Sequence, residues 1–134
     1  MEINANNINK ALPEEILTFF HERYDSVKIP EDVVSFDDLA HIEQMMGFIA
    51  NEQTYLNYLY NLADIEARNS KILGMKEKNQ YDVCKKNLIK SYKDNLENLN
   101  KLLSRKITIY QMNREDERME NRVYNSQKFE QKGA

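Results

Sequence analysis

The chain has 134 residues, of which 41% are hydrophobic and 31% charged, with three Gly, two Pro and one Cys. This composition suits one folded domain, and so few Gly and Pro exclude glycine-rich phosphate loops and the turn-dense all-β classes. The formal charge of −3 is unevenly placed: residues 1–70 carry 4 basic and 13 acidic groups, residues 71–106 carry 10 and 4, and residues 107–134 carry 5 of each.

The N-terminal part predicts a mobile arm followed by a short helix. Residues 1–12 are rich in Asn and show no hydrophobic period, which is typical of an arm. Pro13 suits the first position of a helix, and the two glutamates that follow it favour the positive helix end, so we expect a helix over about 13–26. The Ile29-Pro30 pair predicts extended backbone and a hinge, because the residue before proline avoids the α region.

A long helix is predicted next. Ser35 followed by Asp38 resembles a capping box. Apolar residues then recur at steps of mostly three and four from Phe36 onward, which predicts a helix over about 36–73. Gly74, or the polar stretch at 78–80, is the candidate for its end or for a turn.

The second long stripe of apolar residues predicts a third helix over about 80–112. Its members fall at an average step close to 3.6: Tyr81, Cys84, Leu88, Tyr92, Leu96, Leu99, Leu103, Ile107 and Tyr110. Two long helices joined by a short polar connection fold back on each other. We therefore predict an all-α protein, a long antiparallel helical hairpin with a short N-terminal helix.

The predicted hairpin belongs to one domain, which is followed by a C-terminal extension. Residues 13–112 form one helical domain, and residues 113–134 form a charged, partly helical extension. Each apolar stripe is wider than one partner helix can cover, so we expect the chain to form a homo-oligomer.

Catalytic and metal chemistry find little support in the sequence. Asp38 and His41 have the spacing of one weak half of a helical metal site, and the facing carboxylates that such a site needs are missing. Cys84 lies on the apolar stripe, where a free cysteine behaves as a small hydrophobe. We expect no catalytic residue, no metal and no cofactor, and hence no enzyme.

The sequence also predicts where the protein works. A single cysteine, an N-terminus without the order of a signal peptide and no apolar stretch of membrane-spanning length predict a cytoplasmic protein with no membrane partner. For a phage-encoded chain this means the host cytoplasm.

Tyrosines and basic groups lie close together in the middle of the chain. Tyr55, Tyr58 and Tyr60 are open to two interpretations, helix packing or oligomer contact on one side and base stacking on the other. The Ser104-Arg105-Lys106-Ile107 stretch presents basic side chains where the long stripe ends. The lysine-rich block from 71 to 106 is in turn either a solvated helix face or a surface for phosphates.

The order of these elements resembles the UvsY-type recombination mediators of tailed phages. The resemblance covers roughly residues 38–112 and rests on the Asp64-to-Leu73 stretch, the polar break near 75–81, the leucines of the third helix and the late Ser-Arg pair. It implies a ring-like oligomer that binds single-stranded DNA and helps a recombinase replace the single-strand-binding protein. The residues it implies for the strand, together with the neighbouring basic groups, are Arg68, Lys71, Lys76, Lys85, Lys86, Arg105 and Lys106.

Two functions from different classes follow. The first is a non-enzymatic mediator or accessory factor of phage type that binds single-stranded DNA and promotes recombinase loading. The alternative is a helical scaffold, assembly chaperone or inhibitor that acts through protein contacts only, with the lysines serving as a solvated face.

Overall fold

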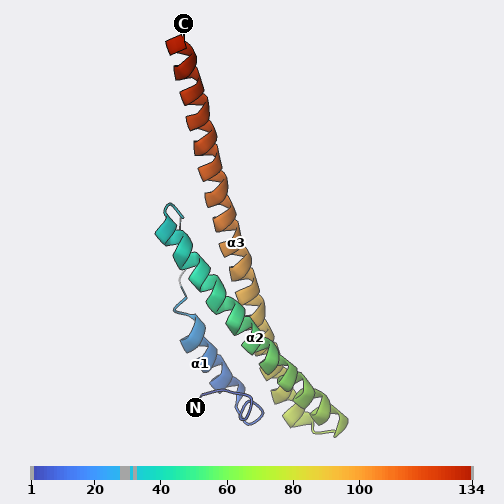
Figure 1. Ribbon diagram of the computed structural model, residues 1–134. Helices are drawn as coiled ribbons and strands as arrows, with labels where there is room; N and C mark the ends of the chain where they lie inside the picture. Colours follow the sequence, from blue (N-terminus) through green and yellow to red (C-terminus); the bar gives the residue numbers. More distant parts are fainter. Residues whose placement is uncertain (1, 28–30, 32, 134) are drawn as a thin grey trace.

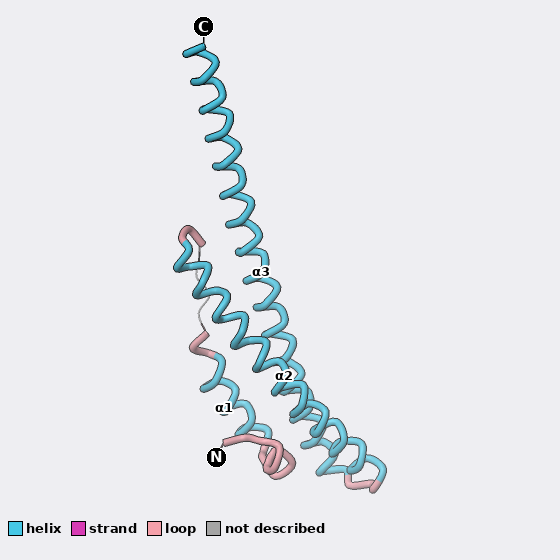
Figure 2. Tube along the Cα trace, viewed as in Figure 1, coloured by secondary structure: helices cyan, strands magenta, loops and turns pink. Residues whose placement is uncertain are grey.

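Three helices account for most of the chain. The computed structural model describes residues 2–27, 31 and 33–133, with side chains up to residue 123. Within these ranges it contains α1 (Pro13–Tyr24), α2 (Phe36–Ile72) and α3 (Lys76–Gly133), and no strand (Figure 2). The predicted all-α class is confirmed. The Ile29-Pro30 hinge lies outside the described residues.

The helical hairpin is made by α2 and α3, which run side by side in opposite directions (Figure 1). The turn between them is a Schellman motif: the Met75 amide donates to the Ser70 carbonyl at 2.9 Å, and the Gly74 amide donates to the Lys71 carbonyl at 3.1 Å. Gly74 has a φ of +68°, a conformation that glycine adopts without strain. Of the two predicted turn positions, Gly74 is therefore the one that ends α2.

The third helix is longer at both ends than the sequence predicted. It begins at Lys76, directly after the turn, and continues to Gly133 through the region expected to be a partly helical extension. Figure 1 shows its C-terminal part running well beyond the start of α2. The Arg114 guanidinium lies 4.3 Å from the centre of the Phe36 ring, at the start of α2. We name residues 115–133 of α3 the overhang.

The apolar stripe of α3 differs from the predicted one at its N-terminal end. Tyr81 is 54% exposed and Cys84 is also exposed, whereas Asp82, Lys85 and Ile89 are buried. The sequence prediction chose Tyr81 and Cys84 for the buried side of the first two turns, because tyrosine and cysteine fit an apolar pattern better than Asp and Lys do. In the structure these two residues lie on the exposed side. From Ile89 onward the predicted and observed stripes agree within one position.

The N-terminal segment is packed rather than mobile. Residues 5–10 form turns, and Ile3, Ile8 and Ala11 are at most 2% exposed in the same core as α1, α2 and α3. The Tyr55 hydroxyl donates to the Ile3 carbonyl, which attaches the segment to α2. The isolated apolar residues of the segment thus serve as anchors, and the predicted mobile arm is wrong for residues 2–11.

A charged cluster joins α1 to α2 at the centre of the molecule. The Arg23 guanidinium donates to both Glu52 carboxylate oxygens, at 2.7 and 2.8 Å, and the Tyr24 hydroxyl donates to one of them at 2.7 Å. The same guanidinium lies over the rings of Phe19 and Tyr55. Because Glu52 is only 7% exposed, this arrangement provides the hydrogen bonds that its burial requires.

The described residues contain no helix long and apolar enough to cross a membrane.

Candidate nucleic-acid interface

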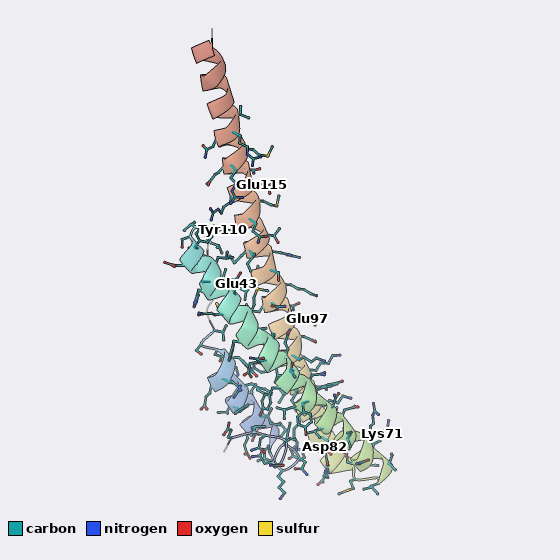
Figure 3. The ribbon with its side chains drawn as sticks, in the orientation of Figure 1. Glu43, Lys71, Asp82, Glu97, Tyr110 and Glu115 are labelled. Carbon is teal, nitrogen blue, oxygen red and sulfur yellow. The ribbon has the colours of Figure 1, made fainter. Side chains whose placement is uncertain are left out.

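Three predicted basic residues surround the end of the hairpin. Arg68 and Lys71 lie in the last two turns of α2, and Lys76 begins α3; all three are exposed. Figure 3 shows Lys71 at this end of the molecule. The tight turn at Gly74 is what brings the three cations from two helices to one place.

Asp64 connects two of the predicted residues. Its two carboxylate oxygens accept from Arg68 at 2.7 Å and from Lys86 at 3.1 Å. The Arg68 side chain is nevertheless 74% exposed and that of Lys86 is 28% exposed. Both cations are therefore held in place by one anion while part of each remains open to solvent.

Lys85 is not part of the exposed surface. It is 5% exposed, and its ammonium donates to the Asn9 carbonyl at 3.0 Å and the Ile8 carbonyl at 3.5 Å, with Asp82 3.8 Å away. Burial lowers the pKa of Lys85, and the charge of Asp82 opposes that effect. In this structure Lys85 therefore attaches the N-terminal segment to α3 and has no room for a phosphate, which corrects its predicted placement.

Arg105 and Lys106 lie at the other end of the hairpin. Nineteen residues separate Lys86 from Arg105, about 28 Å along a helix that rises 1.5 Å per residue. Arg105 is exposed, whereas Lys106 is half-buried and donates to the Glu31 carbonyl. The structure therefore separates the predicted residues into two groups and removes one residue from the surface.

Two lysines that the sequence interpretation missed lie between these groups. Lys90 is exposed, and the half-buried Lys93 donates to the Asn57 side chain at 3.0 Å. Lys86, Lys90 and Lys93 are spaced by four and three residues, so they share one side of α3. That spacing was visible in the sequence and is the signal that would have identified them. We name Lys76, Lys86, Lys90, Lys93, Lys101 and Arg105 the basic face of α3.

The alternatives for the three tyrosines are narrowed by their contacts. Tyr55 packs under Arg23 and bonds to the N-terminal segment. Tyr60 is half-buried, with the Lys93 ammonium 5.4 Å from its ring centre. Both therefore have packing roles, and Tyr58, which is 54% exposed, is the one left open to a partner.

The histidines do not form a metal centre in the described part of the chain. His21 is 2.6 Å from Asp25 and 3.3 Å from the Tyr92 hydroxyl, on the exposed side of α1. No group of three or more Asp, Glu, His or Cys side chains there is placed to hold a metal ion.

The arrangement as a whole can attract an extended anion. Six basic side chains follow one side of α3 over 29 residues, about 44 Å. Asp94 and Glu97 interrupt the line, and Glu97 lies 3.6 Å from Lys101.

Comparison of the chain with protein-family models, curated proteins and solved structures finds no match.

Proposed function

We propose that this protein is a non-enzymatic accessory factor of phage type that binds single-stranded DNA, self-associates and promotes the loading of a recombinase. The observation that supports strand binding is the basic face of α3, which extends over most of the length of the hairpin. Arg68 and Lys71 add to it at the turn. A flexible strand can follow such a line, whereas a compact anion would use only one part of it.

The proposed mechanism is electrostatic. Lysine and arginine side chains displace the counterions of the phosphates, and the gain in counterion entropy drives binding without sequence preference. The acidic first half of the chain contacts the protein partners, which under this proposal are the recombinase and the single-strand-binding protein.

A salt titration tests the strand-binding part. Anisotropy of a labelled poly-thymidine oligonucleotide is measured with the full chain between low and moderate salt. Six contacts predict a slope of log K against log salt of about −4, from about 0.7 for each phosphate on a single strand. A protein that shows no binding even at low salt contradicts the proposal.

A pair of double variants locates the surface. Lys90→Glu with Arg105→Glu removes two contacts from the basic face and is expected to weaken binding and to reduce the slope by about 1.4. Lys106 is left unchanged because its ammonium holds the Glu31 carbonyl. The matched control, Arg118→Glu with Arg122→Glu in the overhang, makes the same change in net charge. Equal effects of the two pairs would indicate a general charge effect and contradict the assigned surface.

A scaffold or assembly chaperone that acts through protein contacts is the second candidate. It is favoured by the large apolar side chains exposed at the hairpin end: Ile72 is 82% exposed, Leu73 71% and Met75 45%. Loops at such turns are usually polar, so these residues favour a protein partner. A stable complex that is indifferent to oligonucleotide and is lost on Leu73→Ser would favour this candidate over the first.

A further inference from the structure

The outer side of α2, which faces away from both other helices, carries an apolar stripe that this chain does not cover. Tyr58, Ile65 and Ile72 lie seven residues apart, about two helical turns, and are 54%, 52% and 82% exposed. Every residue from Gln53 to Ala63 is uncharged, in a chain that is 31% charged. Tyrosine enrichment and the absence of charge are typical of the centre of a protein interface.

The other half of the same side carries small residues at the same spacing. Ala40, Gly47 and Thr54 are exposed and also lie seven residues apart. A Cβ added at Gly47 would meet nothing within 4 Å, so the space above it is open. Thr54 satisfies its hydroxyl within its own helix, on the Ala50 carbonyl at 3.2 Å. The outer side of α2 thus has a large half and a small half.

The large and small residues of the two halves occupy positions that are symmetric about Leu56 along α2. Thr54 and Tyr58, Gly47 and Ile65, and Ala40 and Ile72 are each equally distant from that position along the chain. A second copy that runs antiparallel across the outer side of α2 therefore places each large side chain opposite a small one. Closely approaching helices pack by this alternation of large and small side chains.

The charges beside the stripe agree with the same arrangement. Glu43 and Arg68 are 25 residues apart, close to seven whole turns, and so lie on the same edge of the stripe near its opposite ends. Figure 3 shows Glu43 toward one end of α2 and Lys71, three residues after Arg68, at the other. In the antiparallel pair Glu43 faces the Arg68 of the second copy at both ends, whereas a parallel pair would leave these two residues at different levels, without this contact.

We propose that the outer side of α2 is the self-association interface, formed by two antiparallel copies related by a two-fold axis level with Leu56. This inference deepens the self-association in the proposed function by naming its surface, and it does not depend on strand binding. The pairing covers residues 40–72, about 48 Å of helix. The C-terminal overhang is left outside it.

Sedimentation velocity of the full chain, without DNA, tests the assignment. The wild type is expected at twice the mass of the chain or a multiple of it, and Ile65→Asp is expected at the mass of one chain, with an unchanged helical circular dichroism spectrum. The matched control is Ile109→Asp on α3, because Ile109 is 57% exposed and lies off the stripe. A monomeric wild type, or dissociation by Ile109→Asp and not by Ile65→Asp, would overturn the proposal.

Disulfide trapping tests the direction of the pairing. Gly47→Cys and Ile65→Cys are each made in a Cys84→Ser background, mixed and oxidised. The antiparallel pair predicts mainly the mixed disulfide, whereas a parallel pair predicts only disulfides between identical variants, which would overturn it. A chain that binds DNA as a monomer contradicts this inference alone, and a dimer that binds no DNA contradicts only the strand-binding proposal.

Discussion

At the scale of single residues, Glu52 joins α1 to α2 through a buried carboxylate. Its side chain is 9% exposed and carries the charge that Arg23 and Tyr24 bond to. Glu52→Ala leaves the guanidinium without its partner and is expected to cost about 2–3 kcal/mol, below the full cost of breaking a buried pair because Arg23 remains about a third exposed. Urea unfolding measures this loss in the free energy of unfolding. The control variant Glu22→Ala, at an exposed position of α1, should change the free energy of unfolding by less than about 0.5 kcal/mol.

The same carboxylate makes the stability depend on pH. Burial raises the pKa of Glu52, but the hydrogen bonds from Arg23 and Tyr24 outweigh burial and hold it below its ordinary value. Its contribution is therefore complete above the unfolded pKa of about 4.3 and is lost as the pH falls through the lower folded value. Between pH 5 and 3 the free energy of unfolding of the wild type should fall more than that of Glu52→Ala. Parallel curves of unfolding free energy against pH for the two proteins would contradict the role given to Glu52.

Two glycines should respond to alanine with opposite signs. Gly74→Ala forces a Cβ into the left-handed region at φ +68° and is expected to lower stability by about 1 kcal/mol. Gly47→Ala, within α2 and in open space, should raise it by up to about 1 kcal/mol through helix propensity. Thermal unfolding in an Ile65→Asp background separates these effects from self-association. The same sign at both positions would contradict the role given to Gly74.

For the elements, Lys85 determines whether the N-terminal segment stays on the hairpin. Lys85→Ala removes the donor to the Ile8 and Asn9 carbonyls. Hydrogen exchange should then be faster at the amides of Ile8 and Ala11, which bond within the segment, and unchanged in the middle of α2. The exposed Lys90→Ala should leave both regions as they were. Uniform acceleration along the chain would instead mean that Lys85 supports the whole core.

The elements also show how far the sequence could predict this fold. Capping signals and steps of three and four residues gave α1 and α2 to within two residues of their observed ends. The burial of Ile3, Ile8 and Lys85 was not predictable, because it depends on contacts between segments some 77 residues apart. A lysine on a helix is normally solvated, and here the carbonyls of a distant turn, together with the charge of Asp82, make the burial of Lys85 favourable.

The candidate surface was predictable only in part for the same reason. The local charge count identified the basic block, and helical spacing would have added Lys90 and Lys93. The spacing says nothing about which cation is already held by a carboxylate. Asp64, between Arg68 and Lys86, and Asp82, beneath Lys78 and Lys85, were therefore missed.

For the whole molecule, the dominant property is length. The 58 residues of α3 extend about 87 Å, whereas a compact chain of 134 residues has a radius of gyration of about 14 Å. Small-angle scattering, extrapolated to zero concentration, should give a radius well above that value for Ile65→Asp as well as for the wild type. A value near 14 Å would require α3 to fold back on itself.

Asp64 has a further consequence for the whole molecule under the proposed function. An incoming phosphate must compete with a carboxylate that already neutralises Arg68 and Lys86, so Asp64 acts as a built-in rival anion that limits how tightly the protein can hold a strand. Asp64→Asn should therefore tighten oligonucleotide binding several-fold at low salt, about 1 kcal/mol, while Glu97→Gln, beside Lys101, gives a smaller gain. Such an internal counterion would favour quick release, which a protein that hands a strand to another needs.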